Sequence, residues 1–273
     1  MPHVDLHTHT RYSDGTNRPE QIVVDSAANG LDVIAITDHD ITTGFYEAKN
    51  EAHDWGITAI PGVEVSTTKY HILGYAFDVE NRELKELLRY SRECQLDTTK
   101  KRVALIAGAG VPITIEKVVK AHHQSRIGKF NIAYTMLKDP ECLAYHGRLS
   151  CDEIFVRYMD KGTIGFNIDD QKSVKSKEAI DAIHAAGGIA VVAHPFKQAN
   201  SPEDLDRLVK NGIDGLEVQP NYNGRNEPFI GYAKEHGLLI TYGSDYHGMV
   251  FPHRPLLCKN GNVIEPFWDR VLV

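Results

Sequence analysis

Short apolar runs follow a glycine at five places along the chain. The runs come after Gly30, Gly56, Gly188, Gly212 and Gly237, and they are rich in Val and Ile. Glycine is a usual residue just past the end of a helix, and a run that is apolar on both faces is typical of a strand covered by helices on both sides. This alternation predicts βαβ units and a parallel sheet, either closed into a barrel or open and doubly wound.

The stretch 81–175 does not follow this alternation. It begins with a long charged helical pattern over residues 81–109, in which Leu84, Leu87 and Leu88 form an apolar stripe. Several shorter helical patterns follow, and Ser150 and Glu153 have the spacing of a capping box. We therefore predict a barrel-like α/β core formed by residues 1–80 and 176–273, with a mainly helical insertion over residues 81–175.

Composition and charge narrow the class of protein. The 273 residues are 42% hydrophobic and 25% charged, as in an ordinary globular protein. No apolar stretch is long enough to span a membrane, and the first residues lack the basic and apolar segments of a secretory signal. The net charge of −7 argues against binding long phosphate backbones by charge alone, and the four cysteines form no CxxC pair. We expect a cytoplasmic enzyme that does not bind membranes.

Potential metal ligands recur where the predicted strands end. In parallel α/β folds, functional groups collect at the carboxyl ends of the strands. A single imidazole or carboxylate at such a position is more often a solvated or capping group. Nine of them at one rim would leave polar groups partly buried without a counter-charge. The nine are His7, His9, Asp14, His39, Glu64, His71, His194, Asp245 and His247.

This set of side chains predicts a cluster of divalent ions. Imidazoles and carboxylates without a thiolate suit Mn, Fe or Zn in a catalytic site. Nine ligands are too many for one ion, so we expect two to three ions with a carboxylate such as Glu64 as a bridge.

The motifs DLHTHTRYSDG, ITDHD, PGVEVS, HILGY, AHP and GSDYHG resemble those of the PHP family, the polymerase and histidinol phosphatase metal-dependent phosphoesterases. The resemblance covers about residues 1–80 and 185–250, and the insertion is similar to that of the nucleotide-acting branch. It implies a distorted (β/α)7 TIM-like barrel with a trinuclear metal centre and an insertion that caps the site. It also implies catalytic roles for Asp245, His247 and His194. The implied ligand sets are His7, His9, Glu64 and Asp245; Asp14, His39 and His247; and Glu64, His71 and His194.

Such a centre would hydrolyse phosphate esters. Clustered divalent ions turn a water into a hydroxide nucleophile and neutralise phosphoryl oxygens during displacement. We expect a metal-dependent phosphoric ester hydrolase whose substrate is nucleotide-like, either a nucleoside 3′,5′-bisphosphate or a 5′-phosphorylated short oligonucleotide. Arg126, Lys161 and His253 are candidates for binding it. The guanidinium of Arg126 suits a second phosphate, with a solvated helix end as its alternative. Glu217 is expected to support the ligands or to cap a helix, and not to bind metal itself.

Three other functions remain open. A histidinol-phosphate-type phosphatase would use the same metal centre on a smaller substrate. A non-catalytic PHP binding module would be marked by lost ligands, and none is lost here. An amidohydrolase commonly uses a carboxylated lysine at a strand end, whereas Lys69 and Lys197 lie beside the motifs and not in them.

Overall fold

The computed structural model describes residues 2–122, 126–166, 168, 172–219, 223–250, 255, 256, 267 and 271. Helices and strands alternate through most of this range, as predicted, apart from a helical stretch in the middle. The elements, in chain order, are β1 (Val4–Thr8), α1 (Pro19–Ala28), β2 (Val33–Ile36), α2 (Thr43–Asp54), β3 (Thr58–Val65), β4 (Ile72–Tyr75), α3 (Arg82–Gly108), α4 (Ile115–Ala121), α5 (Lys129–Lys138), α6 (Pro140–His146), α7 (Cys151–Tyr158), α8 (Ser176–Ala185), β5 (Ile189–Val192), α9 (Pro195–Gln198), η1 (Pro202–Leu205), α10 (Asp206–Lys210), β6 (Gly215–Val218), α11 (Asn223–Glu235), β7 (Leu239–Tyr242) and η3 (Gly248–Val250).

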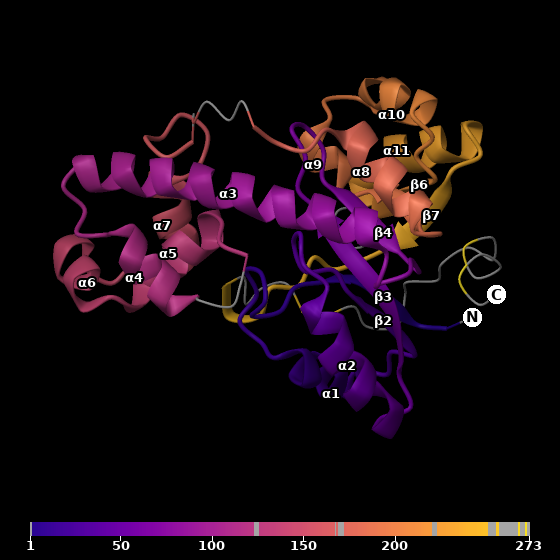
Figure 1. The fold of residues 1–273 in the computed structure, drawn as a ribbon, viewed down its shortest axis with the longest axis horizontal. Coiled ribbons are helices and arrows are strands. Elements are labelled where there is room, and N and C mark those ends of the chain that lie inside the picture. The colour runs from indigo at the N-terminus through magenta and orange to yellow at the C-terminus, as the bar shows by residue number, and fades with distance from the viewer. Residues whose placement is uncertain are drawn as a thin grey trace.

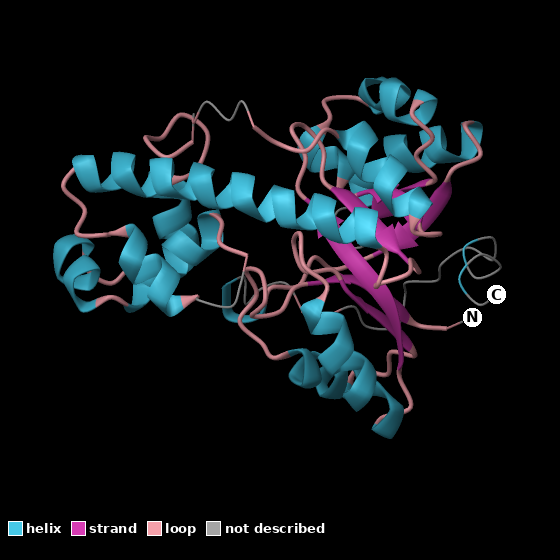
Figure 2. Cartoon of the chain, viewed as in Figure 1, coloured by secondary structure: helices cyan, strands magenta, loops and turns pink. Residues whose placement is uncertain are grey.

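The seven strands form one sheet in the order in which they occur in the chain. After β7 the chain returns to β1, where Tyr246 pairs in parallel with Thr8. The main-chain N–H of His9 donates to the carbonyl of Tyr246 at 2.8 Å, and that of Asp245 donates to the carbonyl of His7 at 2.9 Å. The sheet therefore nearly closes on itself, which confirms the predicted distorted TIM-like barrel. Figure 2 shows its strands in magenta, with helices above and below them.

One strand runs against the others, so the prediction of a wholly parallel sheet was wrong. β4 is antiparallel to both β3 and β5, with Val65 opposite Ile72 and Ile72 opposite Val192. The reason is the short connection over residues 66–71, because a parallel return needs about a dozen residues or more. The reversal brings the beginning of β4 to the rim where its neighbours end. His71, just before β4, therefore joins the side chains that follow the other strands.

The helices occupy two regions (Figure 1). In the first, α1 and α2 lie on one side of the sheet and α8 to α11 on another. In the second region, α3 extends from the sheet to the far end of the molecule, and α4 to α7 pack along its outer half. These outer helices share a hydrophobic cluster that includes Ile106, Ile132 and Ile154. The cluster shows that the helical stretch has an apolar interior separate from that of the barrel.

Local signals explain where several elements begin. The side chain of Asn81 accepts a hydrogen bond from the N–H of Leu84 and starts α3. Ser150 and Glu153 form the predicted capping box at the start of α7, since each side chain accepts from the main-chain N–H of the other. Among the described helices, none is both long enough and apolar enough to cross a membrane.

Candidate metal centre

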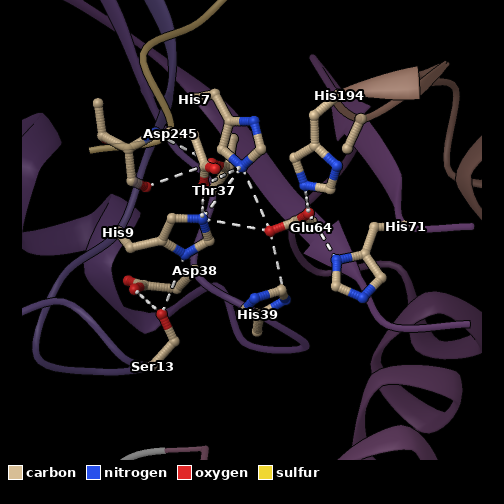
Figure 3. Close-up of polar contacts among 12 residues, drawn as sticks. His7, His9, Ser13, Thr37, Asp38, His39, Glu64, His71, His194 and Asp245 are labelled. Carbon is tan, nitrogen blue, oxygen red and sulfur yellow. Dashed lines mark hydrogen bonds and ion pairs between the residues drawn. The ribbon is translucent and has the colours of Figure 1, made fainter. Parts of the chain in front are cut away.

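All nine predicted side chains meet at one rim of the barrel, and Figure 3 labels all of them except Asp14 and His247. Strand ends position most of them, because they lie in or shortly after the last residues of a strand or, for His71, just before the reversed strand β4. Asp14 lies in the loop after β1. Eight of the nine are at most 8% exposed, and His71 is the exception, with 35% of its side chain exposed. The nine are His7, His9, Asp14, His39, Glu64, His71, His194, Asp245 and His247.

Glu64 lies at the centre of this group, and its two carboxylate oxygens face different histidines (Figure 3). Oε1 lies 2.9 Å from Nδ1 of His71 and 3.1 Å from Nε2 of His194. Oε2 lies 3.2–3.3 Å from ring nitrogens of three further histidines, which are His7, His9 and His39. One buried carboxylate thus contacts two separate sets of imidazoles, as a bridging ligand would.

The other two carboxylates lie at the edges of the same group. Oδ1 of Asp245 is 3.6 Å from Nε2 of His7 and 3.5 Å from Nε2 of His9. Asp14 lies on the opposite side, where its Oδ1 is 3.4 Å from Nε2 of His247 and its Oδ2 is 3.7 Å from Nε2 of His39. Each carboxylate therefore has at least two imidazoles within reach of a shared ion.

The arrangement fits divalent ions. Nε2 of His7 and Nε2 of His9 are 3.0 Å apart, and both lie 3.2 Å from Oε2 of Glu64, so three potential ligand atoms surround a common point. Oδ1 of Asp14 is buried and has no hydrogen-bond partner within the described part of the chain. Four such triplets have ligand atoms within 4.8 Å of one another. A set of imidazoles and carboxylates without a thiolate suits Mn, Fe or Zn.

Burial and charge act in opposite directions on these groups. Burial lowers the pKa of His9, but hydrogen bonds and charge from Asp245 and Glu64 outweigh it and raise the pKa to about 10. The pKa of His7 is also raised, whereas burial dominates at His39 and lowers its pKa. The carboxyl groups are affected in reverse: burial raises their pKa, and the neighbouring cationic groups bring it well below the usual value. Positive charge beside these buried carboxyl groups therefore favours their ionised form.

Glu217 on β6 orients two of the histidines from behind. Its Oε1 lies 2.7 Å from Nδ1 of His7, and its Oε2 accepts the main-chain N–H of His194 at 2.7 Å. Because Glu217 contacts Nδ1 of His7, the opposite nitrogen faces the centre. Glu217 therefore contacts two of the predicted ligands, as expected of a residue that supports them. Gly243 makes this contact possible, since a Cβ there would lie 2.2 Å from Cβ of His7 and 2.4 Å from Oε1 of Glu217.

Asp38 holds the loop that carries His9. It accepts hydrogen bonds from the N–H and the hydroxyl of Thr10 and from the hydroxyl of Ser13, at 2.6–2.7 Å. The Ser13 hydroxyl is in turn 3.3 Å from Nδ1 of His9. Asp38 therefore shapes the site through its neighbours, although it belongs to the same Thr37-Asp38-His39 motif as a potential ligand.

Two residues of α9 contact the centre and were missed in the sequence. Nζ of Lys197 lies 2.8 Å from Oδ2 of Asp245. Nε2 of Gln198 lies 2.7 Å from Nδ1 of His194, and its Oε1 accepts the N–H of His71 at 2.7 Å. Gln198 follows His194 by four residues, which is one helical turn and the available signal for this contact.

The three predicted substrate-binding residues differ in their surroundings. Arg126 is buried, and its guanidinium donates to Oγ of Ser66 at 2.8 Å and contacts Oδ2 of Asp40 at 3.3 Å. Oγ of Ser66 is also 3.4 Å from Nδ1 of His39, so Arg126 lies directly behind the centre. Lys161 is exposed in the turn after α7. His253 lies outside the described residues.

The backbone of two of the nine residues is strained. His194 has φ 29° and Asp245 has φ 58°, which is the left-handed region that L-residues rarely adopt. His194 lies in the loop shortly after β5, and Asp245 lies in the loop shortly after β7. Such conformations persist where surrounding contacts hold them, and they concentrate at functional sites.

Two curated relatives match nearly the whole chain. A 5′-3′ exoribonuclease of Haemophilus influenzae is 30% identical over 281 residues, covering 97% of this chain and 98% of the relative. A 3′,5′-nucleoside bisphosphate phosphatase of Chromobacterium violaceum is 29% identical, covering 90% of this chain and 88% of the relative.

A solved structure and a family match agree with these relatives. The crystal structure of a candidate metal-dependent phosphoesterase from Bifidobacterium adolescentis superposes with a TM-score of 0.83 at 27% identity, covering 100% of this chain and 97% of that one. The PHP domain family matches residues 5–186, which include most of the nine clustered side chains. The chain therefore belongs to the PHP domain family.

Proposed function

We propose that this protein is a metal-dependent phosphoesterase that hydrolyses a phosphate ester of a nucleotide-like substrate. The observation that carries the proposal is the position of Glu64, a buried carboxylate whose two oxygens contact five imidazoles from the ends of four different strands. A bridging carboxylate among imidazoles is typical of multinuclear hydrolytic centres. The names of the relatives, an exoribonuclease and a nucleoside bisphosphate phosphatase, support the choice of a nucleotide.

We assign the nine side chains to two or three ions, with Mn, Fe or Zn as the candidates. The distances support this assignment, since each potential ligand atom lies within 3.7 Å of another in its set. The sets are His7, His9, Glu64 and Asp245 for the first ion, Asp14, His39 and His247 for the second, and Glu64, His71 and His194 for the third.

Ions bound there would lower the pKa of a water molecule and neutralise the oxygens of the phosphoryl group. The protein's own contribution is to hold the ligands in place. Glu217 and Gln198 orient His7 and His194, and Lys197 places positive charge 2.8 Å from Asp245. We give the catalytic roles to Asp245, His247 and His194, which lie around the potential ion sites.

We propose that residues 81–175 cap a barrel formed by residues 1–80 and 176–273, and that the cap contributes to substrate binding. Support comes from Phe130 on α5, whose ring centroid lies 5.7 Å from that of His247. Arg126, Lys161 and His253 remain candidates for binding phosphate groups of a nucleoside 3′,5′-bisphosphate or of the end of a short single-stranded oligonucleotide.

We place this activity in the cytoplasm. Cys94, Cys142 and Cys151 form no disulfide with any other described residue, which agrees with a reducing compartment.

The decisive experiment combines metal analysis with a substrate comparison. Protein purified without chelator should carry at least two transition ions per chain, and chelation should abolish hydrolysis until Mn²⁺ or Zn²⁺ is added back. Glu64→Gln should lose metal and activity together, whereas Glu83→Gln, an exposed position on α3, should retain both. A fully active preparation without metal would contradict the proposal.

The substrate comparison separates the two kinds of phosphatase. Nucleoside 3′,5′-bisphosphates and short 5′-phosphorylated oligoribonucleotides should be hydrolysed with a higher kcat/KM than histidinol phosphate. The reason is the helical cap, which a small amino-alcohol phosphate does not need. A tenfold preference for histidinol phosphate would instead assign the protein to the small-molecule phosphatases.

A further inference from the structure

A cavity of about 280 Å³ lies next to the metal centre, between the loop after β1 and the helices α4 and α5. Four aromatic rings line the cavity, and they belong to Tyr12, His122, Phe130 and Tyr134. We call it the aromatic cavity. It is large enough for a planar heterocycle and is formed jointly by the barrel and the helical cap.

The aromatic cavity shares a wall with the metal centre. Asp14 lines the cavity, and its Oδ1 lies 3.4 Å from Nε2 of His247, while its Oδ2 lies 3.7 Å from Nε2 of His39. Phe130, on the opposite wall, has its ring 5.7 Å from that of His247. A substrate whose phosphate reaches the centre would therefore place its adjoining group in the aromatic cavity.

The rings favour stacking with a planar partner. His122 and Tyr134 meet at 6.0 Å between ring centroids with planes at 61°. Phe130 is held by a stacked contact with Phe155 at 4.5 Å, so its orientation is supported from the cap side. Aromatic side chains bind nucleobases of any sequence, because every base has a π-face.

Two polar side chains on these walls, those of Tyr12 and Asn131, are engaged within the protein. The hydroxyl of Tyr12 donates to Glu47. The side-chain amide of Asn131 accepts from the N–H of Gly128 at 2.7 Å and donates to the carbonyl of Ser13 at 2.8 Å. Because these two side chains already have partners, we expect the aromatic rings to contribute more to binding a base than hydrogen bonds to its edge do.

We propose that the aromatic cavity is a nucleobase subsite that accepts purines and pyrimidines by stacking, with Tyr134 as a main contact. This inference rests on the proposed function, since it identifies which part of a nucleotide lies beside the metal centre. It predicts that the base contributes to binding and that the identity of the base contributes little.

The test is equilibrium binding to the metal-loaded protein, measured by calorimetry with adenosine 5′-monophosphate and ribose 5-phosphate. The nucleotide should bind about 5- to 150-fold more tightly, as expected for one stacked base. Tyr134→Leu should remove at least fivefold of that advantage without changing the binding of ribose 5-phosphate. Tyr134→Phe keeps the ring and should bind as the wild type does. Tyr145→Leu makes the same change at an exposed tyrosine of the cap and is the matched control.

The four nucleoside 5′-monophosphates should bind within about tenfold of one another, because the walls stack bases without reading their edges. Discrimination well beyond tenfold would overturn the base-tolerant subsite. Equal affinity for nucleotide and ribose 5-phosphate, failure of both to bind, or an equal loss of both in Tyr134→Leu would overturn the subsite itself. If the nucleotide shows the predicted advantage but no phosphate ester is hydrolysed, the proposed function fails while the subsite stands.

Discussion

Glu217→Gln should weaken metal binding although Glu217 lies outside the ligand sets. The carboxylate accepts on both sides, from Nδ1–H of His7 and from the N–H of His194, each at 2.7 Å. Glutamine has the same size but only one acceptor oxygen. If that oxygen still accepts the hydrogen bond from the N–H of His194, the amide NH₂ group faces Nδ1 of His7. The ring must then accept at Nδ1 and carry its proton on Nε2, the atom that faces Glu64.

The expected loss follows from this change of tautomer. A protonated Nε2 cannot donate a lone pair to an ion, so each binding event must first rearrange the buried hydrogen bonds. Removing such supporting partners typically costs about 10- to 100-fold in metal affinity, or about 1.4–2.8 kcal/mol at 1.4 kcal/mol per tenfold. Activity at saturating metal should recover in part, because the ligands themselves are still present.

The assay is a competition titration in which a chromogenic chelator and the protein share Mn²⁺ or Zn²⁺. Glu235→Gln, an exposed acid at the end of α11, provides the matched control and should bind metal as the wild type does. Wild-type affinity and wild-type kcat in Glu217→Gln would refute the tautomer argument. A variant that unfolds at lower temperature but binds metal normally would assign Glu217 to the fold alone.

Four further outcomes are expected. Gly243→Ala should destabilise the protein by about 1–3 kcal/mol, measured by thermal unfolding, because its Cβ would lie 2.2 Å from Cβ of His7; an unchanged melting temperature would contradict that contact. Asp245→Ala should lose both metal, by elemental analysis, and activity; retention of either would place Asp245 outside the ligand sets. Metal added to chelated protein should raise the melting temperature with the logarithm of its concentration, and no rise would argue against a specific site. Arg126→Lys should raise KM for bisphosphates more than for simple monoesters, whereas equal losses on both would assign Arg126 to the fold.

Most of the candidate ligands could be predicted because they are marked locally, by their position at or near the end of an apolar run. The strand-end rule predicts that His7 and Asp245, distant in the chain, lie at the same rim, and the resemblance to the PHP family implies that they share an ion. Both the family and the class of hydrolase predicted from the motifs are confirmed by the comparisons.

The direction of β4 was not predicted, because an apolar run does not show whether its strand is parallel or antiparallel to its neighbours. The apolar run that forms β4 would look the same in the sequence whether the strand were parallel or antiparallel to β3. Only the short connection before β4 indicates that the strand is antiparallel. Partners that depend on tertiary packing were also missed. Lys197 reaches Asp245 from a four-residue helix, and Arg126 meets Asp40 and Ser66 across segments that are far apart in the chain.

The left-handed backbone at His194 and Asp245 has a consequence for engineering and for evolution. Such conformations cost about 1–3 kcal/mol each, and glycine or asparagine adopts them more easily. Selection for thermal stability alone would therefore favour replacement of these two residues, and with them the loss of the metal centre. A stabilised variant of this protein should be sought at positions away from the rim, because at the rim folding and activity compete for the same side chains.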